Sequence, residues 1–104
     1  MKAKIWNSSF WVSDVIPEQL KKTYKKLLDQ SGFHIVGFIE HHFFPQGYSA
    51  LYLLTESHLA IHTFPEKNKT YIELSSCSKE FFDNFIKIKT SKCGIIKTKK
   101  NKEE

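Results

Sequence analysis

The feature that most constrains the fold is a change of hydrophobic period near residue 33. Before it, the segment 17–30 predicts a helix, with Pro17 in the first turn and Gly32 just past the end. The apolar residues of this helix recur at helical spacing: Leu20, Tyr24, Leu27 and Leu28. After it, the alternation of apolar and polar residues predicts strands at 33–43, 48–55, 58–64 and 70–77. Strands joined by such short connections pair antiparallel.

Three further segments complete the pattern of elements. Residues 4–12 predict a first strand, residues 78–88 a helix with Ser78 as its N-cap, and residues 93–98 a last strand. The order β-α-β-β-β-β-α-β predicts one α+β domain over residues 1–104. We expect a two-layer sandwich, in which a largely antiparallel sheet carries both helices on one face.

The second face of the predicted sheet is apolar as well. In the strand 33–43, the alternation places Phe33, Ile35, Gly37 and Ile39 on one side. Aromatic residues make up 14% of the chain, and so large a share often lies partly in a subunit interface. We therefore expect the protein to dimerise through the sheet.

The charge comes from lysine alone, since all 16 basic residues are Lys and the formal net charge is +5. Arginine is the preferred residue for bidentate phosphate and base contacts, so nucleic-acid binding is not expected. The lysines crowd the C-terminus, and we expect residues 97–104 to form a disordered tail. No signal-peptide pattern or membrane-length apolar run occurs, so we expect a cytoplasmic protein without membrane contact, whose Cys77 and Cys93 are reduced.

The polar residues of the β-rich centre leave three kinds of chemistry open. A hydrolase could use Ser57 or Cys77 as nucleophile and His62 as base, but the Gly-x-Ser-x-Gly elbow is missing. A metal site could draw on several potential zinc ligands, although the strand-like spacing differs from the helical metalloprotease motif. These ligands are His41, His42, His58, His62 and Cys77. The third alternative is structural, with hydrogen-bonded histidines and a cysteine acting as a small hydrophobe.

Two stretches resemble a known family. These are "FFPQGYSALYLLTESHLAIHTFPE", residues 43–66, and "YIELSSC", residues 71–77. They are similar to the prokaryotic-type S-adenosylmethionine decarboxylases, which are pyruvoyl enzymes of spermidine synthesis. The shared pattern is aromatic-x-Pro-x-Gly-x-Ser, then Glu-Ser-His, then Ile-His-Thr-aromatic-Pro-Glu, then a Cys on the next strand.

The resemblance implies a proenzyme that cleaves itself between Glu56 and Ser57, giving chains 1–56 and 57–104. The Ser57 hydroxyl would attack the carbonyl of Glu56, and Ser57 would become a pyruvoyl group at the new N-terminus. His62 matches the histidine that handles protons in this step, and Ser49 matches a serine that supports it. A homodimer of processed protomers is implied as well. No metal is implied.

The resemblance also implies that the processed protein decarboxylates S-adenosylmethionine to S-adenosylmethioninamine and CO2, and it assigns residues to this reaction. The pyruvoyl ketone is an electron sink for charge on the α-carbon, which no ordinary side chain absorbs. Cys77 matches the proton donor, Phe43 the residue that packs on adenine, and Glu66 the residue that holds the ribose. The N-terminus lacks the usual Gly-x-His-Leu opening, and Ser78 stands where Gly is frequent. Ornithine or arginine decarboxylation, or an uncleaved non-catalytic relative that acts as a binding module, are the alternatives.

Overall fold

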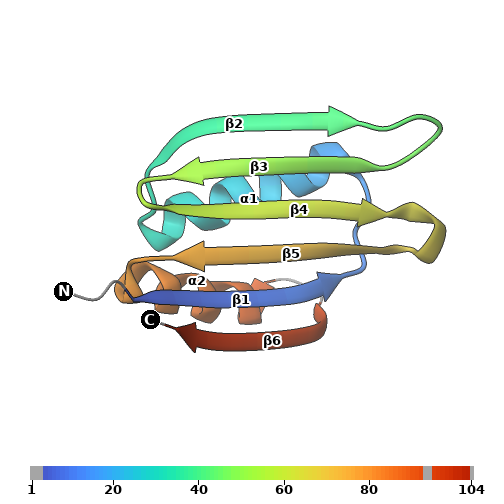
Figure 1. Ribbon diagram of the computed structural model, residues 1–104. Helices are drawn as coiled ribbons and strands as arrows, with labels where there is room; N and C mark the ends of the chain where they lie inside the picture. The colour runs from blue at the N-terminus through green and yellow to red at the C-terminus, as the bar shows by residue number, and fades with distance from the viewer. Residues whose placement is uncertain (1–3, 93–94, 104) are drawn as a thin grey trace.

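The chain folds into one six-stranded antiparallel sheet with two helices on one face (Figure 1). This computed structural model describes residues 4–92 and 95–103. The elements are β1 (Ile5–Val12), α1 (Pro17–Ser31), β2 (Ile35–His42), β3 (Tyr48–Leu54), β4 (Ser57–Phe64), the 3-10 turn η1 (Pro65–Lys67), β5 (Lys69–Ser76), α2 (Lys79–Lys92) and β6 (Ile95–Glu103). The strand order is β2-β3-β4-β5-β1-β6. The predicted α+β fold and order of elements are confirmed.

Helix α1 begins at Pro17, as predicted, and ends at Ser31, one residue beyond the predicted end. Pro17 occupies the first turn, and Gly32 caps the C-terminus with a left-handed φ of 106°. A Cβ at Gly32 would lie 2.8 Å from the Phe81 ring, so both the backbone conformation and the close approach of α2 require glycine. The buried face of α1 is the predicted stripe, and it packs on the sheet.

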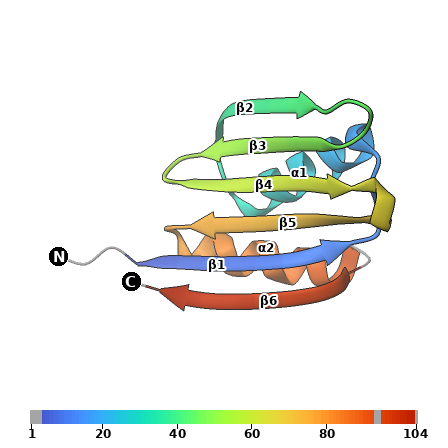
Figure 2. The same cartoon turned by 45° about the vertical axis from the view of Figure 1, so that its right-hand side comes forward.

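Helix α2 is capped as predicted and lies beside α1. The Ser78 hydroxyl accepts a hydrogen bond from the Phe81 N–H at 3.2 Å. The Asn84 side chain donates to the Ser31 carbonyl at 3.0 Å, which joins the two helices. Figure 2 shows both helices on the same side of the sheet, so that neither helix covers the other side.

The two faces of the sheet therefore differ. The helix-covered face holds the core, which includes Phe10, Leu59, Ile61, Ile72 and Leu74. The other face, called here the open face, carries apolar side chains that the described part of the chain leaves exposed. Ile39 is 67% exposed and Leu53 is 50% exposed. No helix among residues 4–92 and 95–103 is long and apolar enough to cross a membrane.

The predicted side-chain pattern of the strand 33–43 is wrong in one respect. A bulge interrupts the β2–β3 register between Ile35 and Gly37. Ile35 pairs with Leu54 and packs against the core, whereas Gly37 pairs with Leu53 on the open face. A bulge inserts one extra residue and so reverses the alternation beyond it.

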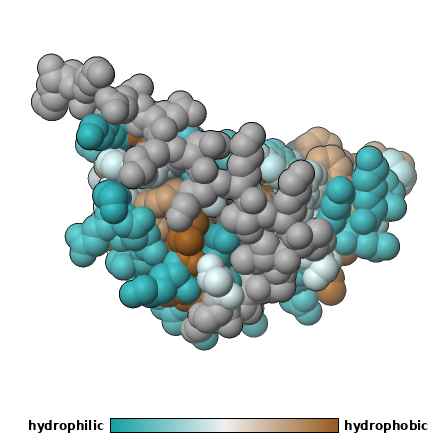
Figure 3. All heavy atoms as spheres, turned by 90° about the horizontal axis from the view of Figure 1, so that it is seen from below, coloured by the Kyte–Doolittle hydropathy of each residue, from teal (hydrophilic) through white to brown (hydrophobic). Residues whose placement is uncertain are grey.

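Strand β6 runs from Ile95 to Glu103, so it extends the last strand predicted at 93–98 through residues 97–103, where the sequence also predicted a disordered tail. Strand β6 pairs with β1 from Ile5 and Glu103 to Val12 and Ile95. This pairing satisfies backbone groups of β1 that would otherwise form a free sheet edge. Glu104 and Cys93 lie outside the described residues. Figure 3 shows the molecule from below, where the residues not drawn in grey are hydrophilic with apolar residues among them.

Candidate active site

The β3–β4 hairpin holds the predicted cleavage position at its turn. Leu54 pairs with Ser57, so Thr55 and Glu56 alone form the connection. Glu56 has a φ of 57°, in the left-handed region that costs a residue with a side chain about 1–2 kcal/mol. The peptide bond between Glu56 and Ser57 thus follows a strained residue.

Ser57 and Cys77 meet at this end of the sheet. The Cys77 N–H donates a hydrogen bond to Ser57 Oγ at 3.2 Å. Ser57 is 8% exposed, whereas the Cys77 side chain is exposed and is a free thiol. Both residues line an open cleft together with Glu56, His58 and Ser75. The hydrogen bond fixes the Ser57 oxygen and leaves its own proton free to be given away.

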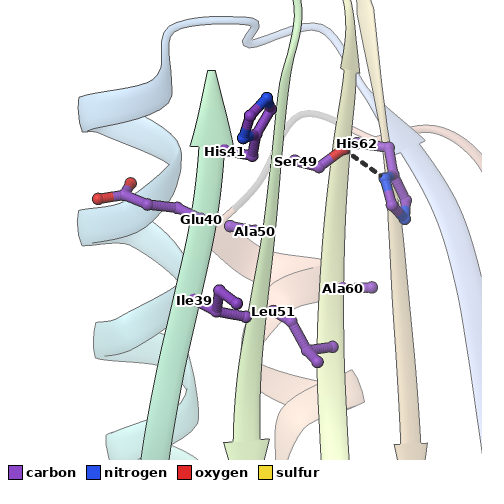
Figure 4. Close-up of a pocket in the computed structure, with 8 residues that line it drawn as sticks. All are labelled: Ile39, Glu40, His41, Ser49, Ala50, Leu51, Ala60 and His62. Carbon is purple, nitrogen blue, oxygen red and sulfur yellow. Dashed lines mark hydrogen bonds between the residues drawn. The ribbon is translucent and has the colours of Figure 1, made fainter. Parts of the chain in front are cut away.

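Ser49 and His62 form a second group on the open face. Ser49 pairs with His62 across β3 and β4, and Ser49 Oγ lies 2.9 Å from His62 Nδ1 (Figure 4). The His62 ring also stacks on Tyr71, with 6.5 Å between ring centroids. Beside this pair lies a hollow of about 330 Å³, whose apolar floor includes Ile39, Leu51 and Ala60.

The two groups lie too far apart to meet within one chain. Ser57 and His62 are five positions apart on β4, which corresponds to about 16 Å along the strand. They also lie on opposite faces, since Ser57 is buried and His62 is exposed on the open face. His62 therefore cannot reach Ser57 of its own chain to act as its base.

Phe43 and Glu66 lie at the His62 end of the sheet, away from Ser57 (Figure 1). Phe43 is 50% exposed, and its N–H donates to the Gly47 carbonyl at 2.9 Å. The Phe43 ring packs edge-on against His41, with 4.5 Å between centroids. Glu66 lies in η1 and is exposed. An aromatic face and a carboxylate are thus presented by two neighbouring loops.

A polar network that the sequence analysis did not predict lies on the other face of the sheet from Ser49. The Tyr48 hydroxyl donates to Glu40 Oε1 at 2.6 Å, and Lys21 Nζ lies 3.1 Å from the same oxygen. The hydrogen bonds from Tyr48 and Lys21 lower the pKa of Glu40. The pKa of Tyr48 is raised, mainly by burial and next by its hydrogen bond to Glu40. Figure 4 shows Glu40 directed towards α1, away from Ser49. No motif marks this network, because it joins residues from three elements.

The sequence analysis also did not assign the aromatic cluster beside His62. Trp11 packs against Phe64 and Tyr71, with centroids 5.7 and 5.2 Å away, and Lys69 Nζ lies 4.3 Å from the Trp11 ring. These residues come from three strands, so only the register brings them together.

The metal-site alternative has no support from the geometry. His58 and His62 both lie on β4 four positions apart, which separates them by about 13 Å. Among residues 4–92 and 95–103, no three or more His, Cys, Asp or Glu side chains form a group that could hold a metal ion.

The fold is similar to that of a known decarboxylase. The crystal structure of the adenosylmethionine decarboxylase from Aquifex aeolicus VF5 superposes with a TM-score of 0.75. The superposition covers 97% of this chain and 88% of that one, at 16% sequence identity. At this identity, the match establishes the fold.

The sequence comparisons identify the family. A model of the S-adenosylmethionine decarboxylase family matches residues 14–93, and the chain belongs to this family. An S-adenosylmethionine decarboxylase proenzyme of Geobacillus sp. (strain WCH70) is 36% identical over 76 residues, 72% of this chain and 60% of the relative. An S-adenosylmethionine decarboxylase proenzyme 2 of Bacillus cereus is 47% identical over 49 residues, 47% of this chain. The resemblance inferred from the motifs is confirmed.

The matches span only part of the relatives. The aligned segment covers 40% of the length of the Bacillus cereus protein and 60% of that of the Geobacillus protein.

Proposed function

We propose that the protein cleaves itself between Glu56 and Ser57 and then decarboxylates S-adenosylmethionine to S-adenosylmethioninamine and CO2. The observation that carries the proposal is the cleavage geometry: Ser57 follows the left-handed Glu56, and the Cys77 N–H holds its oxygen. Membership of the S-adenosylmethionine decarboxylase family supports the same function.

Cleavage uses the Ser57 hydroxyl as nucleophile. Its oxygen attacks the carbonyl carbon of Glu56, the peptide C–N bond breaks, and the hydroxyl proton passes to the released nitrogen. Elimination then frees the carboxylate of Glu56, and hydrolysis with loss of ammonia leaves a pyruvoyl group at residue 57. The first step leaves the two residues joined by an ester, and the strain at Glu56 is released when elimination breaks that ester and opens the chain at the turn.

A dimer explains how His62 takes part. The open face of each chain carries apolar residues, among them Ile39, Leu51 and Leu53, that a second copy would cover. A two-fold axis across this face lays the His62 end of one sheet over the Ser57 end of its partner. Each of two equal sites then combines the Ser57–Cys77 group of one chain with the Ser49–His62 group of the other.

The roles in turnover follow from this arrangement. A pyruvoyl group at residue 57 would supply an electron sink for the charge on the substrate α-carbon. Cys77 lies beside residue 57, where its thiol can return a proton to that carbon. Phe43 offers an aromatic face to the adenine and the sulfonium, and Glu66 offers its carboxylate to the ribose hydroxyls. Ornithine and arginine have neither adenine nor ribose, and would leave these two side chains unused.

The first experiment is a denaturing mass spectrum of the purified wild-type chain and of Ser57→Ala. The wild type should give chains 1–56 and 57–104, the second with a blocked N-terminus, and Ser57→Ala should stay in one piece. Release of labelled CO2 is then measured with S-adenosylmethionine, ornithine and arginine in separate reactions. An uncut wild-type chain after long incubation would overturn the proposal, and release from ornithine or arginine alone would overturn the substrate.

A further inference from the structure

We propose that His58 is a positioning residue that returns a proton to the Cys77 thiolate after each turnover. The proposal rests on the proposed function and adds a residue to it. His58 belongs to the Glu-Ser-His motif, yet neither the motif nor the cleavage step assigns its side chain a role.

The register of β4 and β5 brings His58 close to Cys77. His58 pairs directly with Ser75, and Cys77 follows two residues later. Such diagonal neighbours lie about 7–8 Å apart at the backbone, within reach of a long side chain or one bridging water. His58 and Cys77 are both exposed and line the same cleft.

The other titratable groups near Cys77 are poorly suited to this task. Besides His58 and Cys77, the ionisable side chain that the described residues place on the cleft is that of Glu56, a carboxylate in the turn. The walls also include Leu53 of β3, Val36 of β2 and Ile5 of β1, whose side chains cannot exchange protons. His62 of the same chain is about 13 Å from His58 along β4. In the proposed dimer the partner's His62 serves cleavage at Ser57, and its Nδ1 is hydrogen-bonded to Ser49 of its own chain. Imidazole is the side chain that exchanges protons near neutral pH.

The proton balance is simple. Cys77 Sγ gives its proton to the substrate carbon that lost CO2, and a thiolate remains. The imidazolium of His58 passes one proton to Sγ, directly or through water, and becomes neutral. Solvent then protonates the imidazole again, so no oxidant or further reactant is needed. A thiolate that is not reprotonated in time cannot serve the next turnover.

The first test needs neither cleavage nor activity. The uncut Ser57→Ala chain, with Cys93→Ser to remove the second thiol, is treated with iodoacetamide from pH 5.5 to 9. An imidazole that exchanges protons with Sγ also takes the proton from the thiol as it attacks, so His58→Gln should slow alkylation of Cys77 near pH 7 by about threefold to tenfold. The matched control is His42→Gln, which removes an exposed imidazole from the far end of β2. Circular dichroism checks that both variants are folded.

The second test uses the cleaved enzyme. His58→Gln should still be cut, but more chains should carry an N-terminal alanine per CO2 released, because the carbon of the pyruvoyl group is protonated instead. Added imidazole should restore part of the lost turnover. If the wild type is cut and active but His58→Gln matches His42→Gln in both tests, the proposal for His58 fails and the proposed function stands. If the wild type is neither cut nor active, the proposed function fails, while the alkylation test still decides whether His58 acts on Cys77.

Discussion

Two inactive variants should restore activity to each other if the active site is built from two chains. We would express Cys77→Ala and His62→Ala together, with different tags. Cys77→Ala keeps an intact His62, and His62→Ala keeps intact Ser57 and Cys77. In a mixed dimer, one of the two sites then receives every required side chain.

The size of the effect follows from the two-fold symmetry. Random pairing of equal amounts gives mixed dimers in about half of the molecules, each with one intact site of two, so about one quarter of wild-type activity is expected. Each variant alone loses proton-transfer help worth about 10²–10⁴-fold. The recovered activity is therefore well above the background of either variant, and CO2 release measures it directly.

A matched pair controls for mixing itself. Ser57→Ala and Cys77→Ala both affect the same group, in which the Cys77 N–H is bonded to Ser57. No mixed dimer of these two contains an intact site, so no recovery is expected. Recovery with this pair, or no recovery between Cys77→Ala and His62→Ala in purified mixed dimers, would refute the assignment of the two groups to different chains.

The packing and the charges lead to three more predictions. Ile39→Lys places a charge on the open face, so the protein should be a monomer in light scattering and an uncut chain in mass spectrometry. The control is Ile16→Lys, which changes an exposed isoleucine outside the sheet and should give a dimer that still cleaves itself. Ile61→Ala removes a fully buried side chain and should lower the free energy of unfolding of the uncut chain by about 2–5 kcal/mol, with the urea m-value unchanged. The hydrogen bonds from Tyr48 and then Lys21 lower the pKa of Glu40 below its ordinary 4.5, so the ionised carboxylate stabilises the fold above that pH. This contribution is lost as the pH falls through the lowered pKa, and the melting temperatures of wild type and Glu40→Gln should therefore converge in acid. A difference in melting temperature that stays constant with pH would contradict this.

Local sequence patterns predicted most of the fold, because the residues that start, end and orient a helix or strand lie within or next to it. The helical stripe of α1 and its Pro17 and Gly32 boundaries are read over fifteen residues, and Ser78 caps α2 through its own next turn. The bulge in β2 could not be predicted this way, since it depends on which residue of β3 lies opposite. The last strand was predicted at 93–98, but the continuation of β6 to Glu103 was not, for a similar reason. Its partner β1 lies at the other end of the sequence, and its lysines gave the local signal of a solvated tail.

The candidate site shows a sharper limit of motif reasoning. The motifs identified Ser57, His62 and Cys77 as one set, and the structure brings together only Ser57 and Cys77. The residue numbers alone nevertheless predict that Ser57 and His62 lie on opposite faces of one strand. Residues five positions apart in a strand point to opposite faces, whereas Ser49 and His62 meet because the two-residue turn fixes the register of β3 and β4.

The uncovered sheet face and the divided site have a common explanation. Both helices lie on one face, and the described part of the chain leaves Ile39 and Leu53 exposed on the other, where the proposed pairing with a second copy would bury them. In the proposed dimer, that same pairing would complete the site, because His62 lies on the open face and Ser57 lies at the opposite end of the strand. Cleavage would then wait until two folded chains meet. A chain that has not assembled would keep its Glu56–Ser57 bond, since the group that moves the proton belongs to the partner.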